Sequence, residues 1–223
     1  SVGGKVAVNH ARGKNLIGAF YQPDAVIMDL DLLQTLPARE IATGLGEIIK
    51  YGIIADAEFF AWLEMHHDDV LALTPAAGAH MIARSCEIKA DVVRQDECEG
   101  GLRRILNFGH TLAHAIEKET GYVRYRHGEA VAIGMIGAAR ISRAMGLLSD
   151  EACARIERLI AAMGLPCTVE GVSPDAMYAD LFHDKKTVGG RIHWVLAEEI
   201  GRVCVRSDVS EEIVRRAIKG LLT

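Results

Sequence analysis

The sequence predicts a mainly α-helical fold with short β-strands, and three observations support this prediction. Apolar residues recur every three or four positions over long stretches, as they do on helices that bury one face. Strand patterns are short and occur at the N-terminus and in a hairpin near residues 191–205. The sequence contains neither a βαβ pattern nor a G-x-G-x-x-G motif, so we do not expect a dinucleotide-binding sheet within these 223 residues.

The N-terminal segment, residues 1–35, is predicted to consist of strands and loops. A glycine turn precedes Lys5, and the apolar runs 16–20 and 25–28 each predict a short strand. Two strands alone do not form a stable sheet, so we expect them to pair with a part of a longer protein. The start at Ser1, without an initiator methionine, is interpreted in the same way, as a cut inside a longer chain.

Helical patterns follow over most of the remaining sequence. Pro37 suits the first turn of a helix that we predict to run unbroken from about Ala38 to Met65. Further helices are predicted over 75–94 and from His127 to Met145, the latter so rich in small and apolar residues that we expect it to be wholly buried.

The C-terminal part is predicted from its capping residues. Ser149 or Asp150 can cap a helix that stops at Gly164, and Ser173 with Pro174 opens a shorter one. A strand over 191–196, a turn at Gly201 and a second strand to Val205 predict a hairpin, and Ser210 caps a final helix to about Leu221.

A polar stripe is the first sign of a functional site. Arg103, Asn107, His110 and His114 follow one another at spacings of four, three and four, so one continuous helix would carry them on a single face. The other faces of that helix are apolar. The spacing alone favours a stripe that lines a polar site about as much as an ordinary surface stripe.

The histidines suggest a metal site. Catalytic zinc commonly takes three ligands from histidine and carboxylate side chains, and Glu47, His110 and His127 could supply such a set from three helices. His114 is an alternative third ligand, because it lies four residues after His110 on the same predicted helix. Thr111 stands where the H-E-x-x-H motif needs glutamate, which excludes the usual metalloprotease arrangement. Glu47 could instead form an ordinary ion pair with Lys50.

Lysine and arginine side chains that adjoin glycines, histidines or turns are a second indication of a functional site. Together they would suit a substrate that carries phosphate and carboxylate groups, although each taken singly is more commonly a solvated surface charge. These cations are Lys5, Lys14, Lys50, Lys89, Arg103, Lys185 and Lys186.

Composition excludes several other classes of function. The net charge of −5 and the lack of a basic stripe argue against a nucleic-acid partner. The longest apolar run, residues 130–139, is too short to cross a bilayer, and no signal peptide is present. Five scattered cysteines without a C-x-x-C pair predict reduced thiols and hence a cytoplasmic protein.

Several long motifs resemble the 3-dehydroquinate synthase family in order and spacing. They are SVGGK, GKNLIGAFYQP, LQTLPAREIATGLGEIIKYG, RRILNFGHTLAHAIE, RHGEAVAIGM and HDKK. The resemblance implies an N-terminal NAD-binding α/β domain, which this sequence lacks, joined to a helical C-terminal domain that holds zinc. Residues 1–35 would then come from the junction, and residues 36–223 would be the helical metal- and substrate-binding domain.

The resemblance also implies roles for individual residues. It assigns the zinc, or a Co²⁺ ion, to Glu47, His110 and His127, and it makes His114 a residue for proton transfer. Glu99 matches an acid/base position. Substrate positions match Lys5, Asn15, Lys50, Lys89, Arg103, Asn107 and one of Lys185 and Lys186, of which we favour Lys185. NAD positions match Lys14, Leu32, Leu33, Gln34 and Thr35. The sequence departs from the family pattern at 10–12 and 112–113, away from every proposed ligand.

The implied reaction converts 3-deoxy-D-arabino-heptulosonate 7-phosphate, a phosphorylated sugar acid of the shikimate pathway, to 3-dehydroquinate and phosphate. NAD and zinc would be the cofactors, and the complete enzyme would be a homodimer. These residues alone are expected to be inactive. Two alternatives are a related sugar-phosphate cyclase, such as 2-deoxy-scyllo-inosose synthase, and a helical module that binds metal without turnover.

Overall fold

The computed structural model describes residues 2–10, 13–97, 101–182, 187–188 and 191–223, with side chains except at 9, 13–15, 187–188 and 191. Its helices are α1 (Ala38–Ala55), α2 (Ala57–Met65), α3 (His67–Leu71), α4 (Pro75–Gln95), α5 (His110–Glu119), α6 (His127–Ala144), α7 (Asp150–Ala162), α8 (Pro174–Asp180) and α9 (Glu211–Gly220). Two 3-10 helices are η1 (Leu30–Thr35) and η2 (Leu102–Asn107). Strands pair antiparallel as β1 (Lys5–His10) with β2 (Gly13–Phe20), β3 (Thr187–Val188) with β4 (Arg191–Ile192), and β5 (Trp194–Glu199) with β6 (Arg202–Arg206).

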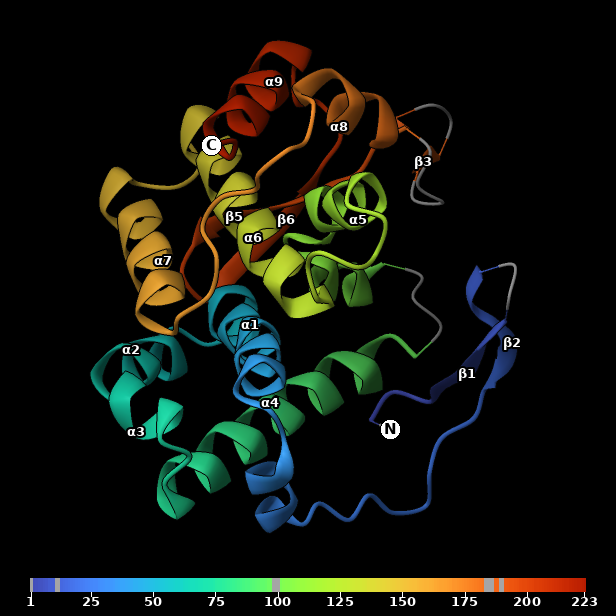
Figure 1. The fold of residues 1–223 in the computed structure, drawn as a ribbon, viewed down its shortest axis with the longest axis vertical. Helices are drawn as coiled ribbons and strands as arrows, with labels where there is room; N and C mark the ends of the chain where they lie inside the picture. Colours follow the sequence, from blue (N-terminus) through green and yellow to red (C-terminus); the bar gives the residue numbers. More distant parts are fainter. Residues whose placement is uncertain (1, 11–12, 98–100, 183–186, 189–190) are drawn as a thin grey trace.

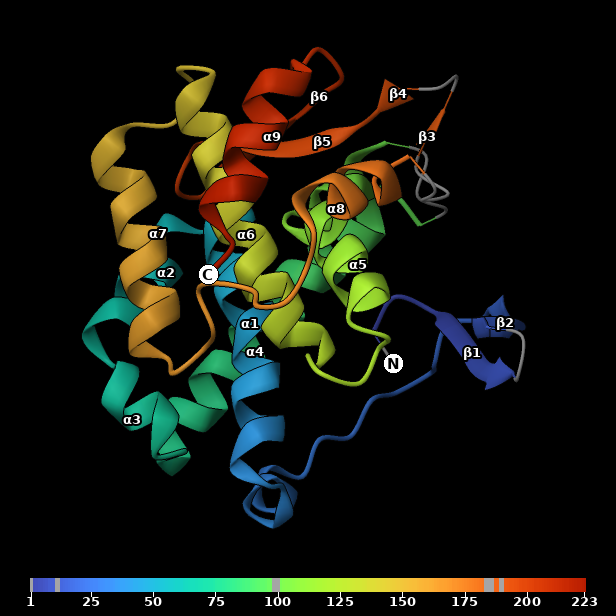
Figure 2. The same cartoon turned by 45° about the horizontal axis from the view of Figure 1, so that its top comes forward.

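Helix α6 is the centre of the core, but the expectation that it is wholly buried is wrong at its end, where Arg143 and Ala144 are exposed. Every residue from Gly128 to Ala139 is buried, and α1, α5, α7, α9 and strand β5 all pack against this helix (Figures 1 and 2). Its alanines and glycines allow neighbouring backbones to approach closely. Within the described part of the chain, none of the helices is both long enough and apolar enough to cross a membrane.

The predicted caps agree with the structure. The hydroxyls of Ser149, Ser173 and Ser210 accept backbone N–H bonds from the first turns of α7, α8 and α9. Pro174 is the first residue of α8, whereas Pro37 lies just before α1 rather than inside it.

The prediction of one helix over 38–65 is wrong, because the chain breaks at Asp56. The Asp56 carboxylate accepts the Phe59 backbone N–H at 2.9 Å and an Arg84 Nε–H at 2.6 Å. An aspartate that caps a helix adopts an extended backbone, and so α1 ends at Ala55 and α2 begins at Ala57.

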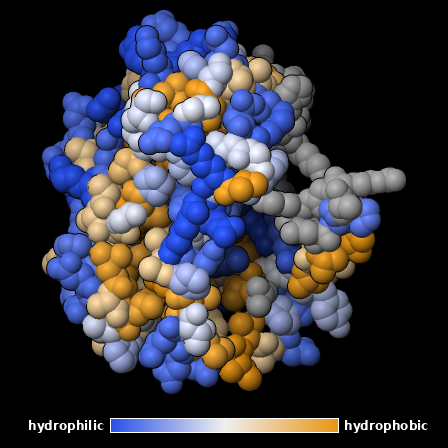
Figure 3. Space-filling view, in the orientation of Figure 1, coloured by the Kyte–Doolittle hydropathy of each residue, from blue (hydrophilic) through white to orange (hydrophobic). Residues whose placement is uncertain are grey.

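The strand predicted over 25–28 is also wrong. Strand β2 pairs instead with β1, with Lys5 opposite Phe20, and residues 25–28 form no strand, with Ile27 95% exposed. The β1–β2 ribbon projects from the helical body, and apolar side chains such as Val8 and Phe20 cover it (Figures 1 and 3). The hairpin near 191–205 is present as β5 and β6, although Arg191 and Ile192 pair with β3 rather than continuing into β5.

Candidate metal and substrate site

Glu47 of α1, His110 of α5 and His127 of α6 converge, although they are far apart in the sequence. One potential ligand atom from each residue lies within 4.8 Å of the others, and the described residues contain no other cluster of this kind. Both histidines are the first residues of their helices, so the starts of α5 and α6 face the middle of α1 (Figure 1).

Each of these three residues has a glycine beside it, and these glycines allow the helices to come so close. A Cβ atom at Gly46 would lie 2.5 Å from the carbonyl oxygen of Gly128, which is closer than real Cβ contacts. Gly109, before His110, has a left-handed backbone with φ of 79°, and a Cβ there would lie 2.7 Å from the Met135 side chain. The small residues therefore determine the distances between the proposed ligands.

The distances suit a single cation. Glu47 Oε1 lies 3.3 Å from His110 Nε2 and 3.4 Å from His127 Nε2. Two atoms that bind the same tetrahedral zinc ion at about 2.1 Å lie about 3.4 Å apart. These two separations therefore match those of ligands around one ion.

Charges at this cluster are strongly coupled. Burial would raise the pKa of Glu47, but hydrogen bonds with His110 and His127 and the charge of Lys50 together lower it far below its usual range. Hydrogen bonds to Glu117 and then to Glu47 raise the pKa of His127 from 6.5 to about 9. Without a metal ion, the carboxylates are therefore paired with protonated groups, which a cation would replace.

The second ring nitrogen of each proposed histidine ligand also has a partner. His110 Nδ1 lies 3.1 Å from the Phe108 carbonyl oxygen, and His127 Nδ1 lies 3.4 Å from Glu117 Oε1. Such partners fix the orientation of an imidazole and leave its Nε2 atom for a metal. Sequence reasoning missed Glu117, although it lies seven residues after His110 and three after His114 and so continues their stripe.

Lys50 is buried beside the cluster. Its side chain is 4% exposed, and its ammonium forms an ion pair with Glu47 Oε2, the carboxylate oxygen that does not face the histidines. The ion pair that the spacing allowed is therefore present, and it leaves Glu47 Oε1 directed at the two imidazoles.

Lys89 and Arg103 extend the positive charge. Burial first, and then the charge of Lys50, lower the pKa of Lys89. Arg103 is 3% exposed, and its guanidinium donates to the carbonyl oxygens of Glu97 at 2.6 Å and Gly3 at 2.8 Å. Arg103 thus holds the N-terminal turn against the segment that follows α4.

The prediction of one helical stripe from Arg103 to His114 is wrong. Arg103 and Asn107 lie in η2, which ends at Asn107, and the left-handed Gly109 separates it from α5. Only His110 and His114 share a helix, with their ring centres 5.9 Å apart.

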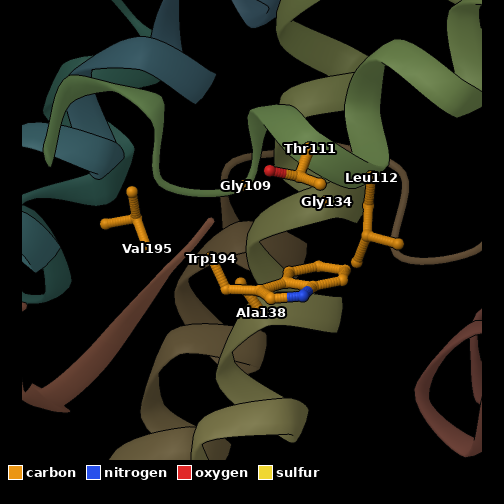
Figure 4. Close-up of a pocket in the computed structure, with 7 residues that line it drawn as sticks. All are labelled: Gly109, Thr111, Leu112, Gly134, Ala138, Trp194 and Val195. Carbon is orange, nitrogen blue, oxygen red and sulfur yellow. The ribbon is translucent and has the colours of Figure 1, made fainter. Parts of the chain in front are cut away.

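A close-up of the crevice under the first turn of α5 shows Trp194 lying below Gly109, Thr111 and Leu112, with Ala138 of α6 beside it (Figure 4).

The other predicted site residues are spread along the N-terminal segment or lie outside the described residues. Leu32, Leu33, Gln34 and Thr35 belong to η1, before the start of α1, and the Thr35 hydroxyl donates to the Leu32 carbonyl oxygen at 2.7 Å. Lys5 is exposed at the start of β1. Lys14 and Asn15 are in β2, but their side chains are not among those described, and Glu99, Lys185 and Lys186 fall outside the described residues.

Two family models together match residues 1–187 of this sequence. A model described as 3-dehydroquinate synthase N-terminal matches residues 1–43, and one described as 3-dehydroquinate synthase C-terminal matches residues 44–187. Among curated proteins, the 3-dehydroquinate synthase of Desulforamulus reducens is 53% identical over 212 residues, which is 95% of this chain and 59% of that protein. The enzyme of that name from Shewanella sp. (strain MR-4) is 52% identical over 219 residues, 98% of this chain and 61% of that protein.

Solved structures with the same fold include two sugar-phosphate cyclases. A 2-epi-5-epi-valiolone synthase from Streptomyces hygroscopicus, with NAD⁺ and Zn²⁺ bound, has a TM-score of 0.89 and 29% identity, and it covers 99% of this chain and 61% of its own. A 2-deoxy-scyllo-inosose synthase, complexed with carbaglucose-6-phosphate, NAD⁺ and Co²⁺, has a TM-score of 0.82 and 27% identity over 97% of this chain and 62% of its own. The mainly helical fold expected from the sequence is therefore confirmed.

Proposed function

This chain belongs to the 3-dehydroquinate synthase family, and from that premise we propose that it forms the metal- and substrate-binding part of such an enzyme. The complete enzyme would convert 3-deoxy-D-arabino-heptulosonate 7-phosphate to 3-dehydroquinate and phosphate. The chain spans about 60% of the length of its curated relatives, since it covers 59% and 61% of the two described above. In our proposal, residues 1–35 are the junction segment and residues 36–223 the helical domain.

The single observation that carries this proposal is the convergence of Glu47, His110 and His127 next to a buried lysine. The donor set of one carboxylate and two imidazoles fits Zn²⁺ or Co²⁺, with a position left for substrate oxygens. When bound there, such an ion would polarise a substrate hydroxyl and stabilise negative charge that develops on it.

The chain's own residues would bind and orient the substrate. Lys50 and Lys89 present positive charge next to the cluster, and they suit the phosphate and carboxylate groups of a sugar acid. His114, half-buried one turn after His110, is the residue that we propose for proton transfer. We keep Arg103, Asn107, Lys5, Asn15, Glu99 and Lys185 as proposed contributors from the sequence resemblance.

NAD would need a larger binding surface than these residues provide. The residues proposed to contact it, Lys14 and those of η1, form no dinucleotide fingerprint, and η1 precedes the helix that carries Glu47. In our proposal NAD is bound mainly by the N-terminal domain that the family resemblance implies. A cytoplasmic homodimer is the expected form of the complete enzyme.

Zinc binding by three purified proteins tests the proposal directly. We expect about one zinc per chain in the wild type and in His114→Ala, and at least a hundredfold weaker binding in His110→Ala, because only the last variant loses a ligand. Equal zinc in all three proteins would contradict the ligand assignment. Loss of zinc from His114→Ala as well as from His110→Ala would favour the competing ligand set, in which His114 is the third ligand.

A related sugar-phosphate cyclase is the second candidate, because the two solved structures described above have this fold. The substrates differ in a carboxylate, which heptulosonate 7-phosphate carries and glucose 6-phosphate lacks. Phosphate release by the complete enzyme from each compound, with NAD and zinc present, separates the two. We expect release from the heptulosonate, and release from glucose 6-phosphate alone would favour the second candidate.

A further inference from the structure

Glu117 is a buried carboxylate that the proposed reaction does not use. It lies on the inward face of α5, seven residues after His110, and it is 5% exposed. A buried ionised carboxylate is costly unless a partner compensates it. Its Oε1 atom lies 3.4 Å from His127 Nδ1, and His127 in turn faces Glu47 Oε1 through its other nitrogen.

The geometry points to Glu117 as the positioning residue for His127, an inference that rests on the proposed metal site. The imidazole of His127 bridges a carboxylate on α1 and a carboxylate on α5, so the two contacts define the plane in which its ring lies. Packing alone would not hold this ring, because its side chain is 44% exposed, compared with 12% for His110. In this arrangement Nδ1–H donates to Glu117, and Nε2 is left with the lone pair that binds metal.

Electrostatics also favour a second carboxylate at the site. Both imidazoles are the first residues of helices, where the helix dipole contributes partial positive charge that disfavours a bound cation. Lys50 adds a further positive charge beside Glu47. Glu117 supplies a second negative charge at the site, which offsets this field without occupying a position around the ion.

Metal affinity of Glu117→Gln and Glu117→Ala tests the inference, with Glu119→Gln on the same helix as the matched control. Zinc dissociation constants come from competition with a chromogenic chelator. We expect binding to weaken about 10- to 100-fold in both Glu117 variants, as removal of such partners commonly does, and to stay within about twofold in Glu119→Gln. If thermal unfolding shows that Glu117→Ala is not folded, the zinc affinity of Glu117→Gln, which keeps the shape of the side chain, tests the inference by itself.

Imidazole proton exchange provides a second readout that general destabilisation would not produce. In zinc-loaded wild type, NMR should show slow exchange with water for the Nδ1 protons of both His110 and His127. In Glu117→Ala the His127 proton should exchange rapidly and the His110 proton, which the Phe108 carbonyl accepts, should not change. Wild-type affinity and unchanged exchange in the Glu117 variants would overturn the inference. Failure of the wild type to bind zinc would instead overturn the proposed function.

Discussion

The charge of His127 depends on whether a metal ion is bound. In the metal-free chain, Glu117 and Glu47 stabilise its protonated form and raise its pKa from 6.5 to about 9. A protonated imidazole cannot bind a metal through the nitrogen that carries the proton. Zinc must therefore displace a proton from this residue at neutral pH.

This displacement predicts a pH dependence of zinc binding. As the pH is lowered below about 9, His127 takes up a proton that zinc must displace, so the apparent zinc affinity should fall up to about tenfold per pH unit. Above that pH the affinity should no longer depend on this proton. Chelator competition between pH 6 and 10 measures it, and calorimetry in buffers of different ionisation enthalpy counts the protons released. An affinity that stays constant between pH 7 and 9 would contradict the raised pKa.

The stability of the metal-free chain should change with pH in the opposite direction. A group with a raised pKa stabilises the folded state fully below its unfolded pKa, here 6.5, and this stabilisation disappears as the pH rises through about 9. Thermal unfolding in the presence of a chelator should therefore show a loss of stability over this window, and His127→Ala should reduce that loss.

At the scale of the element, the distance between α1 and α6 depends on residues without side chains. Gly46 faces the backbone of Gly128, whereas a Cβ atom at Gly44, two residues earlier on the same helix, would meet no neighbouring element within 4 Å. Gly44 and Gly46 are therefore a matched pair: the same substitution meets a neighbouring helix at Gly46 and open space at Gly44.

We expect opposite results from alanine at these two positions. Gly46→Ala should destabilise the chain by about 1–3 kcal/mol, because overpacking forces α1 away from α6, and it should weaken zinc binding. Gly44→Ala should stabilise it by about 0.5–1 kcal/mol, because alanine favours the helix. Urea unfolding and zinc titration of both variants measure these effects. Equal behaviour of the two variants would show that the close contact is unimportant.

Local sequence patterns predicted which helices and strands form better than they predicted where a helix is interrupted or which strands pair. Serine caps and apolar periodicity are local signals, and the starts of α7, α8 and α9 follow from them. The break at Asp56 is an aspartate cap that accepts the Phe59 N–H and also contacts Arg84, and the strand partner of β2 is β1 rather than residues 25–28. Apolar periodicity indicates which face of an element is buried, and it reports neither a cap inside an apolar stretch nor the partner of a strand.

For the whole molecule, residue types at the site were more predictable than the contacts that orient them. Glu47, His110 and His127 stand in recognisable motifs, and the structure brings them together. The partners of Arg103 are backbone carbonyls of Glu97 and Gly3, and any residue can supply a carbonyl, so the sequence carries no signal for them. Their identification required the fold.

We expect this chain to bind zinc without catalysing the proposed reaction, because it has the metal cluster but only a short segment proposed to contact NAD. Supplied with zinc, NAD and heptulosonate 7-phosphate, the 223 residues should bind about one zinc ion but release no phosphate. In the proposed reaction NAD would accept a hydride from the substrate, and the contacts proposed for it in this chain are limited to Lys14 and the residues of η1. A phosphate assay against the longer 3-dehydroquinate synthase of Desulforamulus reducens, as the active control, measures the difference. Phosphate release by this chain above the level of its His110→Ala variant would mean that it holds NAD productively by itself.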